Sequence, residues 1–396
     1  MAMAVGMAMA EAHLAAKFNK EGYPVVDHFT YVLGGDGCMM EGITHEAFSL
    51  AGTLKLGKLI VLYDSNKITI EGSTDIAFTE NVKARFDAYG FQTITVENGN
   101  DIDAVAAAIA EAKADLTRPS MIEIKTQIGY GCPGKQGKAS AHGEPLGDEN
   151  IAEMKKNLNW PSEEAFFVPE EVYANYKAIS EAKAADEEAW NKLFAEYCAK
   201  FPEMKKAWDD EFNMDIAKPL IDDADFWAYE DKPEATRNLS GMVINRLKDK
   251  VPGLVGGAAD LHPSTKTYMK EAGDFSAEDY SGRNLHYGVR EIAMTAIANG
   301  LTLHGLRGFC STFFVFSDYV KPMARLSSIM NIPTTYVLSH DSIGVGEDGP
   351  THEPIEQLAM LRAMPNFNVF RPADATETIA AWYSAATSKE TPTALV

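Results

Sequence analysis

The feature that most constrains the fold is a series of short, continuous apolar runs separated by segments with helical periodicity. Residues 59–63 form such a run, without a single charged side chain, as expected of a strand that is covered on both faces. Residues 41–54 before it place apolar side chains at helical spacing, and residues 101–115 after it form an alanine-rich segment that begins at a capping acid. Residues 121–124 then form another apolar run. This alternation of strand and helix predicts a doubly wound parallel sheet.

The same alternation of strands and helices returns after a segment of different composition. Residues 161–231 are acidic and helical with little strand signal, which favours a connector with solvated faces over an acidic interaction module. We predict strands at 253–258, 307–309, 335–338 and 368–370, with helices at 291–304, 317–330 and 354–364. The predicted domains are therefore an α/β domain at 1–160, a helical connector at 161–234 and a second α/β domain at 235–396.

The net charge, the apolar runs and the positions of the cysteines limit the partners and the cellular compartment that we expect. The net charge of −21 argues against a nucleic-acid partner, because phosphate backbones are bound by clustered Lys and Arg. No run approaches the ~18 apolar residues of a membrane span, and the apolar start at residues 1–10 is better explained as a closely packed helix of small residues than as a signal peptide. The four cysteines are scattered without a C-x-x-C pair. We therefore expect a soluble, cytoplasmic protein with reduced thiols and no membrane partner.

Polar side chains follow two predicted strands where each strand ends. Gly35–Asp36–Gly37 closes the strand that begins near residue 31, and Asp64–Ser65–Asn66 closes the run at 59–63. The two ends meet at the same edge of a parallel sheet, where ligands usually bind. Carboxylate and amide oxygens suit Mg²⁺, and glycine allows a diphosphate to approach the backbone. A lone G-D-G is usually only a turn, but two strand ends at this spacing favour a cation site.

The string at residues 35–46, GDGCMMEGITHE, closely resembles the thiamine-diphosphate motif of transketolases. This resemblance implies that Asp36, Asn66 and the carbonyl of Ile68 bind Mg²⁺ or Ca²⁺. It also implies cofactor contacts from Gly35, Gly37, Glu41 and the loop residue His142, which faces cofactor and substrate and acts in catalysis. Glu41 and Glu46 look like the buried acidic relay that the family places across its dimer interface; without the resemblance, both are better explained as acids at a helix N-terminus.

His286–Tyr287–Gly288–Val289–Arg290–Glu291 opens a helix, where a carboxylate is usually a capping acid. The resemblance implies a catalytic role for Glu291. A carboxylic acid bonded to the aminopyrimidine nitrogen shifts the opposite amine to an imine, which can remove the C2 proton of the cofactor. Phe313, Phe316 and Tyr319 lie at i, i+3, i+6 spacing and are implied to hold the pyrimidine ring, although an aromatic stripe is more often core. Asp260 is a further implied cofactor contact.

Residues 344–349 match G-x-G-x-x-G and follow a predicted strand, so a dinucleotide fingerprint is the rival interpretation. Two acids inside the turn and Pro350 after it argue against a pyrophosphate site. The longer string at 340–354 is characteristic of transketolases. The resemblance implies that sugar-phosphate substrates are bound by Arg237, Ser264, His340, Asp348 and His352, with His340 also catalytic.

The resemblance covers essentially the whole chain and implies a diphosphate-binding domain, a pyrimidine-binding domain and a homodimer with its active site at the subunit interface. It implies transfer of a two-carbon ketol unit between sugar phosphates in the pentose phosphate pathway. Family members are expected to carry a further segment before the position of Met1 and more sequence after Val396. Two alternatives stay open: a non-catalytic or partner-dependent relative, and a neighbouring thiamine enzyme such as dihydroxyacetone synthase or 1-deoxyxylulose-5-phosphate synthase.

Overall fold

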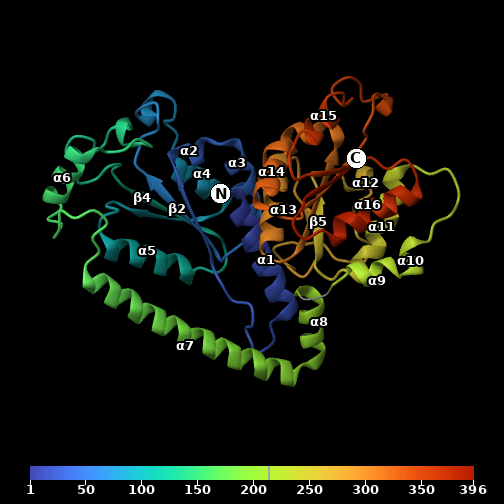
Figure 1. Ribbon diagram of the computed structural model, residues 1–396, viewed down its shortest axis with the longest axis horizontal. Coiled ribbons are helices and arrows are strands. Elements are labelled where there is room, and N and C mark those ends of the chain that lie inside the picture. The colour runs from blue at the N-terminus through green and yellow to red at the C-terminus, as the bar shows by residue number, and fades with distance from the viewer. Residues whose placement is uncertain (213–214) are drawn as a thin grey trace. The chain divides into compact units, whose positions relative to one another are not determined.

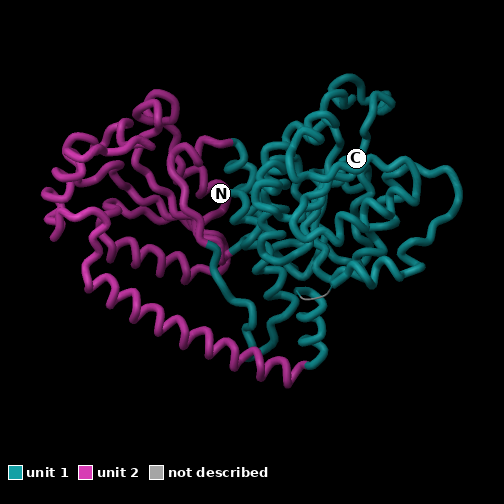
Figure 2. The backbone as a smooth tube through the Cα atoms, viewed as in Figure 1, with its two compact units in different colours: residues 1–30, 42–56, 202–396 teal, residues 31–41, 57–201 magenta. Residues whose placement is uncertain are grey.

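The computed structural model describes residues 1–212 and 215–396. The chain divides into two compact units (Figure 2). Unit 1 comprises residues 1–30, 42–56 and 202–396, and unit 2 comprises residues 31–41 and 57–201. No helix in the described ranges is both long enough and apolar enough to span a membrane.

Unit 2 is built on a four-stranded sheet in the order β1-β2-β4-β3. The strands are β1 (Thr30–Gly35), β2 (Leu59–Ser65), β3 (Gln92–Val96) and β4 (Ser120–Lys125). β2 and β3 both pair with β4 in parallel. The expected apolar strand is β2, whose residues Leu59, Ile60 and Val61 are completely buried. β3 is absent from the sequence prediction because Gln and Thr alternate with its apolar residues.

Helices surround this sheet and then extend the unit (Figure 1). They are α2 (Asp36–Met40), α4 (Val82–Tyr89), α5 (Ile102–Ala114), α6 (Asp148–Asn157) and α7 (Glu170–Lys200). The Asp101 side chain accepts from the backbone N–H of Ala104 at 3.0 Å, so the predicted capping acid of α5 is confirmed. α7 has 31 residues, nearly all of them exposed, which agrees with the predicted helical segment with solvated faces.

Unit 1 contains a six-stranded sheet in the order β6-β5-β7-β8-β10-β9, and all its neighbouring strands run parallel. The strands are β5 (Leu254–Ala258), β6 (Asn284–His286), β7 (Arg307–Phe313), β8 (Thr335–Ser339), β9 (Asn368–Phe370) and β10 (Thr393–Leu395). The helices are α8 (Pro202–Phe212), α9 (Ala217–Ile221), α10 (Ala224–Trp227), α11 (Thr236–Lys250), α12 (His262–Thr265), α13 (Glu291–Leu303), α14 (Ser317–Met330), α15 (Gln357–Arg362) and α16 (Ala375–Thr387). The predicted fold of two parallel α/β units with a helical segment is confirmed.

The core of unit 1 lies where α11 and α16 cover the sheet. Leu247 of α11 and Trp382 of α16 join Phe309 and Val337 of the central strands in one buried cluster. The indole Nε1 of Trp382 donates to Ser240 Oγ at 2.8 Å, so its polar atom is satisfied inside the core. α13 and α14 lie on the opposite side of the sheet (Figure 1), which makes the sheet doubly wound.

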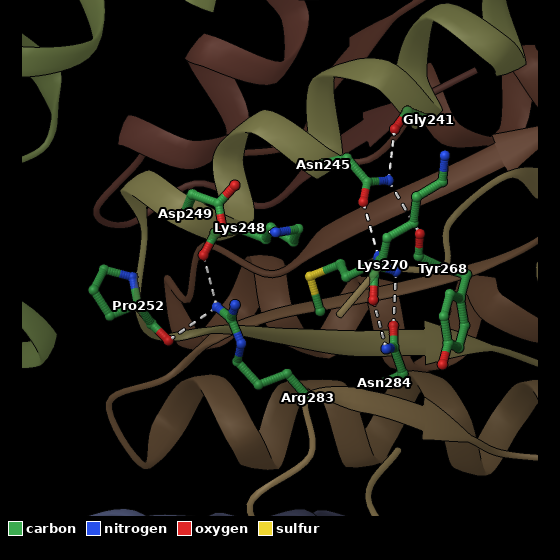
Figure 3. Close-up of polar contacts among 10 residues, drawn as sticks. Gly241, Asn245, Lys248, Asp249, Pro252, Tyr268, Lys270, Arg283 and Asn284 are labelled. Atoms are coloured by element: carbon green, nitrogen blue, oxygen red, sulfur yellow. Dashed lines mark hydrogen bonds and ion pairs between the residues drawn. The ribbon is translucent and has the colours of Figure 1, made fainter. Parts of the chain in front are cut away.

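Two asparagines fasten the segment between α12 and β6 against its neighbours (Figure 3). Asn284 accepts from Met269 N at 2.8 Å and donates to Met269 O at 2.9 Å, while Asn245 of α11 accepts from Lys270 N at 2.8 Å. Arg283 Nη1 donates to the carbonyl of Lys248 at 2.9 Å. The segment therefore covers β6, the edge strand of the sheet, and satisfies backbone groups that would otherwise be open.

The N-terminal helix α1 (Ala2–Phe18) and α3 (Gly42–Thr53) belong to unit 1 because both pack on α13. α1 and α13 cross at two glycines. A Cβ added to Gly6 would lie 2.2 Å from Ile297 O, and one added to Gly300 would lie 2.1 Å from Met3 O. The predicted closely packed helix of small residues is confirmed.

This crossing makes a testable prediction for Gly300→Ala. Alanine favours a helix by about 1 kcal/mol over glycine, but the added methyl must force the two backbones apart. We expect the free energy of unfolding to fall by about 1–3 kcal/mol, as measured by urea denaturation. Gly42→Ala in α3 is the matched control, since its Cβ meets no atom within 4 Å; equal stability of the two variants would contradict the prediction.

His13 on α1 is a buried titratable group, with 2% of its surface exposed. Its Nδ1 donates to the carbonyl of Tyr280 at 3.0 Å, while Nε2 is buried without a partner within the part of the chain that the structure describes. Burial lowers the pKa of His13 to about 4, and the positive charges of Lys17 and Arg283 act in the same direction, against the Tyr280 carbonyl and Asp279. The folded protein therefore holds this imidazole neutral.

A pH dependence follows, because the unfolded chain takes up a proton near pH 6.5 and the folded chain does so only near pH 4. Stability from this group is present above pH 6.5 and is lost as the pH falls towards 4. Between pH 7 and pH 5 the native chain should lose about 2 kcal/mol more than a His13→Asn variant. Urea denaturation at both pH values measures the difference; parallel losses in the two proteins would refute it.

Candidate active site

Asp36 is the most strongly fixed of the predicted cation ligands. It begins α2 directly after β1, and only 3% of its surface is exposed. The Tyr63 hydroxyl donates to Asp36 Oδ1 at 2.6 Å, and the backbone N–H of Lys67 donates to Oδ2 at 2.9 Å. Both donors come from β2 and the turn after it, so the adjacent strand ends do meet around this carboxylate.

Asn66 and Ile68 lie in the same turn. Asn66 Oδ1 accepts from the backbone N–H of Ile68 at 2.9 Å. Lys67 between them has a φ of +62°, in the left-handed region, which folds the turn back over Asp36. The structure therefore places all three predicted cation ligands on two neighbouring segments of unit 2.

These residues fit a hard divalent cation. Their donor set is one carboxylate, one amide oxygen and one backbone carbonyl, which leaves the remaining positions of an octahedral ion to phosphate oxygens and water. Throughout residues 1–212 and 215–396, no three His, Cys, Asp or Glu side chains gather as a metal site. A Cβ added at Gly37 meets nothing within 4 Å, so there is open space beside the backbone for a diphosphate.

Two contacts of this region escaped the sequence analysis. Tyr63 belongs to the apolar run, and nothing in the sequence indicates that its hydroxyl contacts Asp36. Asp64 accepts a short hydrogen bond from the Thr126 hydroxyl at the start of the next loop. Both contacts join strand ends that are distant in sequence, so only the sheet topology reveals them.

His142 lies in the loop between β4 and α6, at the end of a short 3₁₀ turn (Ala139–Ala141). Its backbone N–H donates to Ala139 O at 2.8 Å, and its side chain is exposed. Lys135 Nζ donates to the carbonyl of Ser140 at 3.0 Å and ties the loop together. The predicted ligand loop is thus ordered by its own contacts, with the imidazole turned to the surface of unit 2.

In unit 1, Glu291 is the first residue of α13. Glu46 of α3 reaches the same helix end, where its Oε2 accepts from the backbone N–H of Ala293 at 3.0 Å. Partial burial raises the pKa of Glu291, and the nearby negative charge of Glu46 adds to that rise. The site therefore favours a proton on Glu291. Arg290 Nη2 donates to Ser49 Oγ at 3.2 Å and fastens α3 beside this helix end.

Glu41 differs from Glu46 in its surroundings. It is the C-terminal cap of α2 in unit 2, and its side chain is exposed in the single chain. The resemblance implies burial of both acids across a dimer interface, so that role of Glu41 stays a prediction.

The predicted aromatic stripe forms a continuous row. The rings of Phe313 and Phe316 have centroids 6.2 Å apart and planes only 7° apart, and Tyr319 follows at 6.3 Å from Phe316. Phe313 ends β7 and Tyr319 lies in the first turn of α14, with a 3₁₀ turn (Phe314–Phe316) between them. Exposure rises along the row, from 8% at Phe313 to 51% at Tyr319, so it is a surface rather than a core cluster.

His340 joins this row to the predicted phosphate anchor. Its ring centroid is 3.9 Å from that of Phe313, and Arg237 Nη1 lies 2.9 Å from its Nε2. A guanidinium can only donate, so Nε2 must be the unprotonated acceptor, and Nδ1 donates to Ser339 Oγ at 2.9 Å. Burial and the charge of Arg237 both lower the pKa of His340, which favours this neutral form.

A pocket of about 460 Å³ brings three of the six predicted substrate residues together. Arg237, His340 and Asp348 supply its polar side, and Trp382 and Leu395 are among its apolar lining. It lies by the carboxyl ends of β8 and β10, the edge at which parallel sheets bind ligands. A cation, an imidazole and a carboxylate around one concave surface suit a phosphorylated polyol.

The other predicted residues lie outside this pocket. Ser264 is half-buried on α12, and Asp260 is exposed just before it with a φ of +62°. His352 contacts the aromatic row, with its ring centroid 5.3 Å from that of Phe316. The dinucleotide fingerprint is excluded as predicted, because the turn at 343–345 leads into a loop and α15 begins only at Gln357.

The bond between Tyr63 and Asp36 predicts that Tyr63→Phe weakens cation binding. Removing the hydroxyl lets the carboxylate rotate, and loss of such an orienting partner typically lowers metal affinity by about 10–100-fold. Calorimetric titration of Mg²⁺ or Ca²⁺ with thiamine diphosphate present measures this. Tyr89→Phe in the same unit is the matched control; equal affinity in both variants would remove the orienting role.

Comparison with known proteins accounts for this arrangement. The family model for the thiamine diphosphate binding domain of transketolase matches residues 1–216, and that for the transketolase pyrimidine binding domain matches residues 232–396. The chain is 52% identical over 397 residues to the transketolase of Halalkalibacterium halodurans and 51% identical over 398 residues to that of Bacillus subtilis. Each alignment covers 100% of this chain and 59% of the relative.

Solved structures agree with the sequence comparison. A transketolase from Leishmania mexicana matches with a TM-score of 0.94 at 45% identity, over 100% of this chain and 59% of that one. A Pichia stipitis transketolase in complex with sedoheptulose 7-phosphate matches over the same shares with a TM-score of 0.94 at 44% identity. The chain therefore spans about 59% of the length of these relatives. By sequence and by structure, it belongs to the transketolase family.

Proposed function

We propose that this chain carries out the transketolase reaction with thiamine diphosphate and Mg²⁺ or Ca²⁺. A two-carbon ketol unit passes from a ketose phosphate such as xylulose 5-phosphate to an aldose phosphate such as ribose 5-phosphate, as a step of the pentose phosphate pathway. The observation that carries this proposal is Glu291, an acid with a raised pKa at the start of α13 beside Glu46. Related Pichia stipitis transketolases have been solved with xylulose 5-phosphate and with sedoheptulose 7-phosphate.

When bound, thiamine diphosphate supplies the carbanion that accepts and releases the ketol unit. Glu291, whose pKa is raised, would donate a hydrogen bond from its protonated form to the pyrimidine ring, which Phe313, Phe316 and Tyr319 would flank. Asp36, Asn66 and the Ile68 carbonyl hold the cation. Gly35 and Gly37 leave room for the diphosphate, and His142, Glu41 and Asp260 make the remaining cofactor contacts.

The substrate is held by the polar side of the pocket. Arg237 donates to its phosphate, for which a guanidinium is well shaped. His340, neutral in the absence of ligand, can exchange a proton with a sugar hydroxyl, and Asp348 accepts from another. Ser264 and His352 complete the set around the phosphate and hydroxyl groups, and His142 is a further substrate contact.

The protein acts as a homodimer whose active sites form at the subunit interface, and it works in the cytoplasm without nucleic-acid or membrane partners. Support comes from the location of the cation ligands and of Glu291 in different compact units, and from the net charge of −21. Sedimentation with cofactor present tests the assembly; a monomer at micromolar concentration contradicts it.

The reaction is tested by incubating the purified chain with thiamine diphosphate, Mg²⁺, xylulose 5-phosphate and ribose 5-phosphate. We expect sedoheptulose 7-phosphate to form. Glu291→Gln should abolish exchange of the cofactor C2 hydrogen for deuterium while cofactor binding remains measurable, because an amide cannot supply the proton. The control is Glu377→Gln, an acid in the first turn of α16. Absence of ketol transfer, with exchange unaltered in Glu291→Gln, would exclude the proposed activity.

A further inference from the structure

Two histidines outside the candidate active site point their ring nitrogens at each other. His28 follows α1 and His304 follows α13, 276 positions later, yet their Nε2 atoms lie 2.8 Å apart. The ring centroids are 4.8 Å apart and the planes differ by 27°. Because the ring centroids lie much farther apart than the two Nε2 atoms, the rings meet head to head through these nitrogens.

Hydrogen bonds order the backbone next to both histidines. Asn19 donates to Val26 O at 2.8 Å and accepts from Val26 N at 2.9 Å, which fixes the turn that leads into His28. His304 is the C-terminal cap of α13, with its backbone N–H bonded to the carbonyls of Gly300 and Leu301. Both side chains therefore project from ordered segments of the backbone.

The surroundings favour a positive charge between these rings. The C-terminus of a helix carries partial negative charge, and α13 ends at Leu303, directly before His304. His28 is exposed and His304 is half-buried, so an ion can reach the pair from solvent. Burial and the neighbouring His28 lower the pKa of His304, which keeps that imidazole in the unprotonated form that metal binding needs.

We propose that His28 and His304 bind a divalent transition-metal ion of the zinc class through their Nε2 atoms, with water completing the coordination. Zinc–nitrogen bonds of about 2.0–2.1 Å at a tetrahedral angle place two nitrogens about 3.3 Å apart. The Nε2 atoms need to separate by about half an ångström, and the rings need to tilt from their in-line arrangement so that both nitrogens point at the ion; the exposed His28 side chain can provide this movement. Imidazole nitrogen suits Zn²⁺ and Cu²⁺ better than Mg²⁺.

The bound ion acts as a crosslink within unit 1. It joins the turn after α1 to the end of α13 that lies opposite Glu291, and α1 and α13 already cross at Gly6 and Gly300. No third metal-binding side chain completes the group among the residues that the structure describes. Binding is therefore reversible, and the stabilisation of the fold grows with the logarithm of the free metal concentration once that concentration exceeds the dissociation constant.

The experiment titrates Zn²⁺ into the full chain against a chromogenic chelator, with excess Mg²⁺ to fill the cation site of unit 2. Wild type, His28→Asn and His304→Asn are compared with His286→Asn, an exposed histidine that is bonded to Asp274. We expect His28→Asn and His304→Asn each to weaken one binding event at least tenfold, and His286→Asn to leave it unchanged. Zn²⁺ should raise the thermal unfolding midpoint of wild type and of His286→Asn only.

A second measurement needs no substitution. Diethyl pyrocarbonate modifies accessible imidazoles, and Zn²⁺ should protect His28 of the wild-type chain, as read by mass spectrometry. Unchanged Zn²⁺ affinity in His28→Asn and His304→Asn, or loss of binding in His286→Asn instead, overturns the proposal. Equal modification of His28 with and without Zn²⁺ does the same, and the pair is then an imidazole–imidazole hydrogen bond.

Discussion

In unit 1, the carboxylates of Glu46 and Glu291 both lie at the N-terminal end of α13, and the proposed chemistry depends on this arrangement. Glu46 occupies the N–H of Ala293 at the start of α13, so Glu291 gains a negative neighbour rather than the full benefit of the helix dipole. Partial burial raises the pKa of Glu291, and the negative charge of Glu46 adds to that rise. The contact exists only because α3 packs on α13, and Arg290 bonded to Ser49 holds α3 there. Packing of α3 on α13 thus contributes to the raised pKa of Glu291.

In unit 2, the surroundings of Asp36 differ from those of Glu291. Here a carboxylate is buried, and two donors from the neighbouring strand end, the Tyr63 hydroxyl and the Lys67 N–H, satisfy it. Hydrogen bonds to the charged form offset the loss of hydration. The two acids therefore have contrasting surroundings: Asp36 accepts two hydrogen bonds, whereas Glu291 has a negatively charged neighbour.

Much of this arrangement could be predicted from the sequence. Buried parallel strands carry apolar runs, so β2, β4 and β8 were predicted, and the polar residues after β1 and β2 meet at one edge of the sheet, as predicted. β3 was not predicted because Gln92, Thr93 and Thr95 interrupt its apolar pattern. The Arg237–His340 pair and the Tyr63–Asp36 bond were also hidden, since they join segments whose approach is set by sheet order. The pairing of His28 with His304 leaves no trace in local spacing.

The crossing of α1 and α13 has a consequence for the angular position of Glu291. Gly300 can meet Met3 only in one rotational setting of α13, since any side chain at that point collides with backbone. Glu291 lies nine residues earlier on the same rigid helix, about two and a half turns away. The glycine contact therefore fixes the rotation of α13 about its own axis. A single-residue insertion or deletion between Glu291 and Gly300 would turn the Glu291 side chain by about 100° around that axis. The length of α13 is thus as constrained as its composition.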